Sequence, residues 1–280
     1  INRMNNTKEE ETFSFQGEQF ADIQMLHYRL PEFETLSLRQ KKLIYSLSQA
    51  TLFGRDITFD QFGKYNLRIR KTLEAVYKHY QGESTDYEFQ ALGEYLKQVW
   101  FASGIHHHYA CDKFIPSFTE QFFRDAVLSV DKKQLPLREN EDVNELLNEL
   151  CPVIFDPTLH PKRVNKADGV DLICTSACNY YEGVNQLEVE NYYAKMKAEG
   201  PDSEQPSYGL NSTLIKKGNS VREDVWKADG KYGAAIKQII VWLERAKAFT
   251  ENEQQHKVIS LLIKYYETGD LRDFDRYSIE

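Results

Sequence analysis

The sequence predicts an α+β protein that is mainly helical, with helices around a small antiparallel sheet or partial barrel. Most apolar residues recur at the three- and four-residue spacing that places them on one face of a helix. Two stretches depart from this spacing. Residues 21–30 carry apolar side chains on both alternating faces, and residues 210–226 contain two strand-like runs around Gly218 and Asn219. The strands are therefore expected to be few.

An interior strand is expected near the start of the chain. Residues 21–30 stop at Pro31 and have the pattern of a strand that is buried on both sides. Together with a hairpin at 210–226, this strand is expected to build the small sheet. Helical spacing occurs in residues 43–51, 69–80, 89–100, 187–196, 236–243 and 258–266. The last two helices of this series are expected to pack as an antiparallel pair.

Capping residues indicate where several of these helices begin and end. Thr85 with Glu88, and Asn185 with Glu188, have the spacing of the capping box, in which each partner satisfies a free backbone N–H of the first turn. Gly269 stands where a left-handed C-terminal cap is expected. These residues therefore predict two helix starts and one helix end.

Charged residues are expected mainly on solvated faces. The acidic run at residues 139–142 precedes an apolar helix and predicts a solvated first turn, which the helix dipole favours. A basic face on one predicted helix is expected to be solvated too, and it consists of Arg68, Arg70, Lys71 and Lys78. A last helix begins at Asp270, and its short amphipathic stripe predicts a packing partner that is missing.

Composition bounds the classes of function. The 280 residues have a net charge of −8, which opposes binding to the phosphate backbone, so no nucleic-acid partner is expected. No apolar run reaches the roughly 18 residues that a membrane span requires. The 17 tyrosines and 16 phenylalanines are many, and aromatic side chains serve both cores and ligand grooves.

The polar start of the chain differs from the rest. Residues 1–16 are expected to be a disordered leader, and residues 17–280 a single lobe. The compartment stays open, because the chain can be cytoplasmic, or periplasmic after removal of a leader.

The common catalytic motifs are absent from the sequence. None of the seven histidines is followed by glutamate, so the zinc motif H-E-x-x-H does not occur. The G-x-S-x-G elbow, the P-loop and G-x-G-x-x-G are absent as well. These absences remove the usual sequence routes to a zincin, a serine hydrolase or a phosphate-binding loop.

Three consecutive histidines, residues 106–108, form the stretch with the most side chains that could bind a metal or take part in catalysis. Neighbouring side chains on a helix or strand point in different directions, so at most two of the three can share a metal ion. His106 and His108 would then need a third ligand, for which Cys111 and Asp112 are the local candidates. The alternatives are solvated rings on a loop, or polar rings that line a cleft.

Several blocks of residues carry a more specific signal. They are residues 19–24 (QFADIQ), 54–57 (GRDI), 64–67 (KYNL), 99–101 (VWF), 104–109 (GIHHHY), 155–159 (FDPTL), 208–212 (YGLNS) and 241–248 (VWLERAKA). In this order, they resemble the N-terminal region of bacterial dipeptidyl peptidase III enzymes. The resemblance extends over nearly the whole chain.

The resemblance implies a zinc exopeptidase that removes dipeptides from the N-terminus of short peptides, built as two lobes around a wide cleft. Family members are much longer than this chain. Their zinc is bound by an H-E-x-x-G-H helix and a glutamate on a later helix, and an E-S-Y segment supplies a tyrosine that assists the reaction. None of these motifs occurs in the sequence.

We therefore expect the chain to be the substrate-cleft lobe, truncated at its C-terminal end. The full-length protein is expected to be a zinc metallo-dipeptidyl-peptidase. This chain alone is expected to bind no zinc and to be inactive without the C-terminal metal-binding lobe.

One site residue is implied by the resemblance. Residues 109–114 match the family segment in which an aromatic ring lines the substrate cleft, and the matching aromatic is Tyr109. Tyrosine suits contact with peptides, because its flat ring buries area at a low cost in rotamer freedom. His108 is the second expected peptide contact, through donation to a carbonyl. The alternative for Tyr109 is a loop residue with a structural role.

Two other functions stay open at this point. The chain could be a stand-alone, non-catalytic module that binds peptides or another partner in an aromatic groove. It could also be an enzyme with its own centre at the histidine run, in which case substitution of His106 and His108 would remove activity without unfolding the protein.

Overall fold

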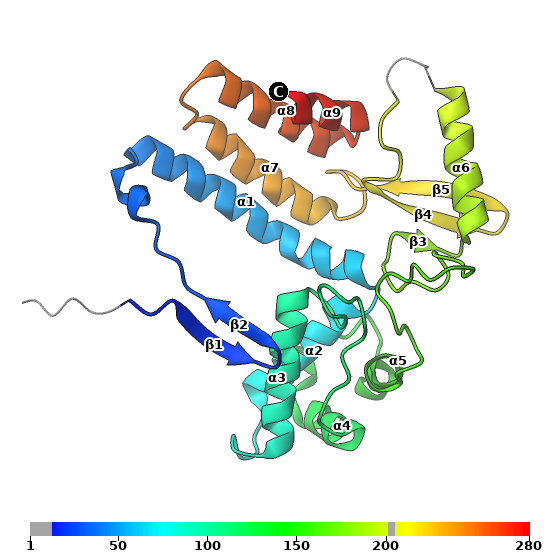
Figure 1. Ribbon diagram of the computed structural model, residues 1–280. Coiled ribbons are helices and arrows are strands. Elements are labelled where there is room, and N and C mark those ends of the chain that lie inside the picture. Colours follow the sequence, from blue (N-terminus) through cyan, green and yellow to red (C-terminus); the bar gives the residue numbers. More distant parts are fainter. Residues whose placement is uncertain (1–12, 201–204) are drawn as a thin grey trace, which may run out of the picture. The chain divides into compact units, whose positions relative to one another are not determined.

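The computed structural model describes residues 13–200 and 205–280 (Figure 1). The chain divides into two compact units, Ile1–Thr35 and Leu36–Glu280. Most of the predicted leader, residues 1–12, lies outside the described residues, and Gln16 already belongs to a strand. The prediction of a mainly helical α+β protein is confirmed.

The first unit contains a β-hairpin. Strand β1 (Gln16–Phe20) pairs antiparallel with β2 (Ile23–Leu26), and a short 3-10 helix, η1 (Pro31–Thr35), follows. The predicted interior strand at residues 21–30 is therefore wrong. Ala21 has a φ of 46° and belongs to the turn between the strands, and Ile23 is the one buried residue of β2.

The sequence pattern misled for a physical reason. Apolar side chains on both faces of a strand show that both faces could be covered but not that anything covers them, and Met25 and Leu26 of β2 are exposed. Within the described residues, β2 has a single partner, β1. The hairpin and the later strands form two separate sheets, and neither sheet closes into a barrel.

The second unit contains nine α-helices and three strands among the described residues. The helices are α1 (Leu38–Phe62), α2 (Asn66–His79), α3 (Tyr87–Ala102), α4 (Glu120–Ser129), α5 (Val143–Phe155), α6 (Gln186–Glu199), α7 (Gly233–Lys247), α8 (Glu253–Thr268) and α9 (Leu271–Ile279), with a 3-10 turn η2 (Lys132–Gln134). The strands are β3 (Tyr181–Glu182), β4 (Ser212–Lys217) and β5 (Ser220–Val225).

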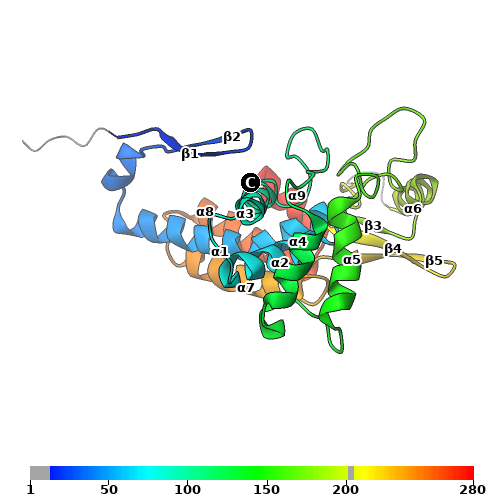
Figure 2. The same cartoon turned by 90° about the horizontal axis from the view of Figure 1, so that it is seen from below.

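Three groups of buried side chains hold this unit together. The largest joins α2, α3, α4 and α5 and includes the fully buried Leu73, Leu96 and Leu150. The second joins α1, α7 and α8, which lie side by side in both views (Figure 1, Figure 2). The third is small and lies around Leu214 of β4. The predicted packing of the helices at 236–243 and 258–266 is confirmed by the second group.

The predicted hairpin at 210–226 is confirmed. β4 and β5 pair antiparallel, and Lys217 faces Ser220 across a tight turn in which Gly218 has a φ of 59°. A glycine fits this left-handed position at little cost. β3 adds to the other edge of β4 in a parallel pairing, so the three-stranded sheet is mixed.

Two of the three predicted caps are confirmed. Asn185 and Glu188 form the capping box of α6, and Gly269, with a φ of 69°, ends α8. The start of α3 differs from the prediction. Its N-cap is Asp86, whose carboxylate accepts from the Glu88 N–H, and the Glu88 carboxylate accepts from the Thr119 hydroxyl instead.

Helix α9 has a packing partner in the structure, contrary to the prediction. Its Phe274 ring lies 5.2 Å from that of Tyr265 in α8. Asp273 of α9 is buried and accepts from Lys264 and Thr268 of α8. Residues 198–207, whose glycine, proline, aspartate and serine are typical of a linker, fall partly outside the described residues, and α6 extends into them as far as Glu199.

Candidate functional site

The histidine run follows directly after α3. The helix ends at Ala102, and Ser103 takes a left-handed conformation with a φ of 55°. Gly104 then passes close to α2, because a Cβ at this position would lie 2.2 Å from Nδ2 of Asn66. The chain can make this approach only with glycine at position 104.

The three histidines have different surroundings. His106 is 2 % exposed, and its Nε2 donates to the carbonyl of His160 at 2.8 Å. His107 accepts at Nδ1 from the N–H groups of Tyr109 and Ala110, at 3.1 and 3.0 Å. His108 stacks on His107 with 4.4 Å between ring centroids. The rings therefore do not converge on one ion.

The local ligands proposed for a metal are engaged elsewhere. Asp112 forms an ion pair with Lys162 at 2.6 Å, and the Cys111 sulfur lies 3.6 Å from the Arg163 guanidinium. In the part of the chain that the structure describes, no three His, Cys, Asp or Glu side chains are placed to hold a metal ion. The described residues thus do not fit a zinc site, which needs three or four convergent ligands.

Backbone hydrogen bonds hold the histidine segment on both sides. Phe114 N–H donates to the Ile105 carbonyl at 2.8 Å, so the segment folds back on itself. Arg163 N–H donates to the Cys111 carbonyl at 2.8 Å, and the Arg163 guanidinium donates to the His108 carbonyl at 3.1 Å. That guanidinium also lies 4.5 Å from the centre of the Phe62 ring of α1.

A buried lysine, Lys113, links the histidine segment to the turn after α5. The backbones of Lys113 and His106 form an isolated antiparallel β-bridge. The Lys113 Nζ donates to the carbonyls of Asp156 and Leu159 at 2.5 and 2.9 Å. Burial lowers the pKa of Lys113, and the Asp156 carboxylate partly offsets this effect. The ammonium therefore fixes the turn after α5 against the histidine segment.

A pocket of about 270 Å³ lies next to His106. Its walls come from the α1–α2 junction, the histidine segment, α5 and the loop that leads to β3. The lining residues are Gly63, Lys64, Tyr65, Asn66, Ile105, His106, Val153, His160, Ser176, Ala177, Cys178, Asn179 and Tyr181. Two blocks that carry the sequence resemblance, 64–67 and 104–109, thus meet in this pocket.

The ionisable groups of the pocket favour their uncharged forms. Burial lowers the pKa of His106 to about 4 and also lowers the pKa of His160. Burial raises the pKa values of the Cys178 thiol and the Tyr181 hydroxyl. At neutral pH these four side chains are uncharged, because desolvation disfavours the ionised form of each.

Tyr109 and His108, the predicted peptide contacts, lie outside the pocket lining. Tyr109 is 86 % exposed at the tip of the segment. His108 is half-buried, with its ring edge-on to Phe101 at 4.9 Å and to Tyr109 at 5.2 Å. The structure thus places an exposed aromatic ring on a segment whose backbone is fixed by hydrogen bonds on both sides of Tyr109.

Sequence reasoning missed most of the pocket residues. By itself neither Asn66 nor His160 gave a signal, since a single asparagine or histidine is common in any chain. The matched blocks contained Asn66 and ended one residue before His160. The resemblance of separate sequence blocks to one family was therefore the signal from which some of the pocket residues could have been found.

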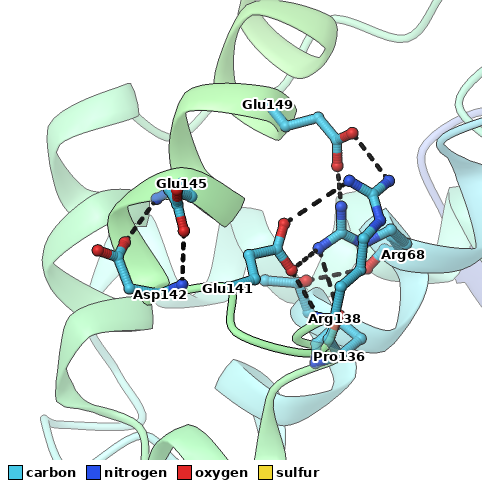
Figure 3. A network of polar contacts seen from close by, with 8 residues as sticks. Arg68, Pro136, Arg138, Glu141, Asp142, Glu145 and Glu149 are labelled. Atoms are coloured by element: carbon cyan, nitrogen blue, oxygen red, sulfur yellow. Dashed lines mark hydrogen bonds and ion pairs between the residues drawn. The ribbon is translucent and has the colours of Figure 1, made fainter.

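An ion-pair network fixes α2, which carries Asn66, to α5 (Figure 3). Arg68 pairs with Glu141 at 2.6 Å and also with Glu149, and Arg138 pairs with Glu149 at 2.9 Å. Asp142 beside it forms the capping box of α5. Burial raises the pKa of Glu141, but hydrogen bonds from Arg68 and the Arg138 N–H outweigh this, so the pKa is lowered overall.

The network corrects two predictions about charge. The acidic run at 139–142 is not simply solvated, because the Glu141 side chain is 10 % exposed and paired. The basic face is not simply solvated either, because Arg70 is buried against the Phe59 ring and pairs with Asp56 at 2.9 Å. Spacing along one helix could not reveal partners on other elements.

Comparisons with known proteins give a likeness of fold. No family model and no curated protein sequence match the chain. Among solved structures, the structure of DPP III from Caldithrix abyssi is similar, with a TM-score of 0.50 and 15 % sequence identity over 85 % of this chain. The match covers 32 % of that protein, so the chain spans about a third of its length. At this identity the likeness concerns the fold alone.

A membrane span is not found either. Across residues 13–200 and 205–280, no helix combines the length and the apolar character that crossing a bilayer requires.

Proposed function

We propose that this chain is the peptide-positioning lobe of a zinc-dependent dipeptidyl peptidase of the DPP III type. The observation that carries the proposal is the similarity of fold to part of a DPP III structure over 85 % of the chain. The sequence blocks at 64–67 and 104–109, which resemble that family, also meet around one pocket. Short peptides are the proposed ligands.

Tyr109 is the proposed main contact with the peptide, and His108 the second. An 86 % exposed aromatic ring on a held backbone can bury area against a ligand with little loss of freedom. Arg163 holds the backbone of His108, and the His108 ring supports that of Tyr109. Positioning a peptide in this way lowers the entropic part of a reaction barrier.

The chemistry of cleavage is proposed to reside in a metal-binding lobe outside this sequence. Zinc in such an enzyme polarises the scissile carbonyl and activates water. The described residues do not fit a zinc site. The proposed role of this chain is therefore to bind and orient the substrate.

Peptide binding to the isolated chain tests the proposal. Dissociation constants of short alanine-rich peptides are measured by calorimetry for the unaltered chain and for Tyr109→Ala. Loss of one aromatic contact at the centre of a binding site is expected to weaken binding by at least about fivefold, which is about 1 kcal/mol. Tyr109→Phe should keep most of the affinity, because the ring remains.

Tyr87→Ala is the matched control, since Tyr87 is also an exposed tyrosine, 71 % accessible at the start of α3. Equal binding by the Tyr109 and Tyr87 variants would contradict the role of Tyr109, and no binding by the unaltered chain would contradict the proposal itself. Binding that depends on Tyr109 in a protein whose reading frame ends at Glu280 would instead favour the stand-alone peptide-binding module.

A further inference from the structure

We propose that the pocket beside His106 binds one carboxylate of the peptide, either its C-terminal carboxylate or an acidic side chain. This inference rests on the proposed function and adds to it a site for a single negative charge. The residues that would contact the carboxylate are Lys64, Tyr65, His160 and Tyr181, all of which line the pocket.

A ligand can reach only some of the polar atoms in the pocket wall. Nδ2 of Asn66 and Nδ1 of His106 are fully buried, so they take no part in binding. Three other lining side chains are only partly buried. They are Tyr65, His160 and Tyr181, and their hydroxyls and ring nitrogens keep some exposure and have no hydrogen-bond partner among the described residues. These atoms are therefore available to a ligand.

The available groups can all donate a hydrogen bond. A tyrosine hydroxyl carries one proton, and a neutral imidazole carries one on either nitrogen. Burial raises the pKa of Tyr181 and lowers that of His160, so both side chains are uncharged at neutral pH and keep this proton. A carboxylate only accepts, with about four lone-pair sites, and so complements a set of donors.

Lys64 supplies a positive charge at the rim of the pocket. Its side chain is exposed and, among the described residues, has no ion-pair partner. A hydrogen bond between an ammonium and a carboxylate is about twice as strong as one between neutral groups. Because Lys64 is in contact with water, this interaction should weaken as the salt concentration rises.

Two further cations act on the pocket from behind its wall. Besides burial, the charges of Lys113 and Arg163 lower the pKa of His106, and Lys113 also lowers that of His160. The Asp156 carboxylate offsets part of the charge of Lys113. The remaining positive potential attracts a carboxylate in the pocket and repels an ammonium.

Two acidic side chains close to the lining do not cancel this potential. Asp60 accepts from Asn179 of the lining at 3.3 Å, and the ammonium of Lys231 lies 3.6 Å from the same oxygen, so its charge is paired. Glu182 follows Tyr181 in β3, and neighbouring side chains of a strand point to opposite faces. The Glu182 carboxylate is therefore directed away from the face that carries Tyr181.

The start of α2 adds to the positive potential. The helix begins at Asn66 in the pocket wall, and its N-cap residue, Tyr65, makes no side-chain hydrogen bond to the first turn. The first N–H groups of a helix have no partner within it, and the helix dipole places a partial positive charge there. The dipole thus has the same sign as the charges of the surrounding cations.

The size and place of the pocket suit the end of a short peptide. Its volume of about 270 Å³ equals the room of about nine waters at roughly 30 Å³ each, which holds one residue and not a whole peptide. His106 and Tyr109 are three residues apart, so their Cα atoms are separated by no more than about 11 Å. An extended peptide spans that distance in three to four residues, at about 3.3 Å per residue.

Peptide pairs that differ in one charge test the inference on the unaltered chain. Alanine peptides of increasing length, from the tripeptide to the hexapeptide, are each compared as the free acid and as the C-terminal amide, by calorimetry at pH 7. A second set keeps the C-terminal amide and places Glu or Gln at each position in turn. At least one peptide with a carboxylate is expected to bind about tenfold more tightly than its neutral partner, since a hydrogen bond to a charged group corresponds to at least about that factor.

The two sets distinguish the source of the carboxylate. A tighter free acid identifies the C-terminus of the peptide, and a tighter Glu peptide identifies an acidic side chain. In either case the difference between the charged and the neutral peptide should shrink as the salt concentration is raised.

Two pairs of variants link the preference to this pocket. Lys64→Gln removes the charge at the rim, and Lys217→Gln removes a charge from an exposed lysine at the end of β4. Ala177→Leu fills part of the pocket, and Ala167→Leu places the same change on an exposed loop residue. The preference should fall at least about threefold in Lys64→Gln and Ala177→Leu, and it should persist in both controls.

The outcomes separate the two proposals. Equal affinity of acid and amide at every length, and of Glu and Gln at every position, overturns the pocket inference and leaves the peptide-positioning lobe intact. A preference that Lys64→Gln or a folded Ala177→Leu leaves unchanged also overturns the inference. If Ala177→Leu does not fold, the exposed Lys64 still decides. If no peptide binds at all, the proposed function fails and the inference fails with it.

Discussion

Gly104→Ala tests the geometry on which the site depends. The added Cβ would lie 2.2 Å from Nδ2 and 2.8 Å from Cγ of Asn66, whereas ordinary contacts begin near 3.4 Å. The Asn66 side chain also lies close to Gly63, since a Cβ at that position would be 2.8 Å from the same Nδ2. Either Asn66 or the start of the histidine segment must therefore move.

The expected cost follows from two effects. Overpacking a filled interior costs about 1 to 3 kcal/mol. Displacing Asn66 also breaks its hydrogen bond with the Ile105 N–H, which is worth about 0.5 to 1.5 kcal/mol. We expect Gly104→Ala to lower the free energy of unfolding by about 2 to 4 kcal/mol, as measured by urea denaturation followed by circular dichroism.

Gly54→Ala is the matched control. Gly54 lies inside α1, and nothing stands within 4 Å of the position of its added Cβ. Alanine favours a helix over glycine by about 0.5 to 1 kcal/mol, so this variant should be more stable than the parent.

The contact with Asn66 is tested by combining substitutions. In an Asn66→Ala background, Gly104→Ala should cost at least about 1 kcal/mol less than it does alone, because the clash is removed. The reasoning is refuted if Gly104→Ala costs less than about 1 kcal/mol, or if its cost is the same in both backgrounds.

The remaining stability predictions concern pH. Because the pKa of Glu141 is lowered in the fold, its contribution is complete above the unfolded value of about 4.3 and is lost as the pH falls through the folded value. Glu141→Gln removes hydrogen bonds to a charged group, each worth about 1.5 to 3 kcal/mol, so it should cost about that much at pH 7, and the difference from the parent should shrink below about pH 4. An unchanged difference at pH 3 would contradict the ion pair. His106 has a pKa of about 4 in the fold and about 6.5 when unfolded, so the unfolded state binds the proton first and stability falls with pH from 6.5 downward. Between pH 7 and 5 this loss should be about 2 kcal/mol, and urea denaturation of His106→Phe should show a flatter dependence; an equal slope would contradict the burial of a neutral ring.

Local signals in the sequence predicted local structure well. The Gly218-Asn219 pair marked the hairpin because few residues take a left-handed φ, and Asn185 with Glu188 marked the start of α6 because both cap bonds lie within four residues. The fold class followed from many such signals. By contrast, Thr85 was taken for the N-cap of α3, and its neighbour Asp86 takes that role, which spacing alone does not distinguish.

Features that depend on distant partners could not be predicted in the same way. In the sequence, Glu141 has the pattern of a solvated acid, whereas in the structure it pairs with Arg68 of another helix. His106 was considered as a metal ligand, and its place beside the His160 carbonyl depends on how the turn after α5 meets the histidine segment. The pocket residues come from four separate parts of the chain, and the resemblance of blocks to one family was the only sequence feature that joined two of them.

The central claim is that this chain holds a peptide while the cleaving metal belongs to a lobe outside it. Metal analysis of the purified chain after incubation with zinc and dialysis, combined with hydrolysis of a dipeptidyl-naphthylamide, tests it most directly. The account predicts far less than one zinc per chain and no turnover. One tightly bound zinc per chain together with turnover would contradict it.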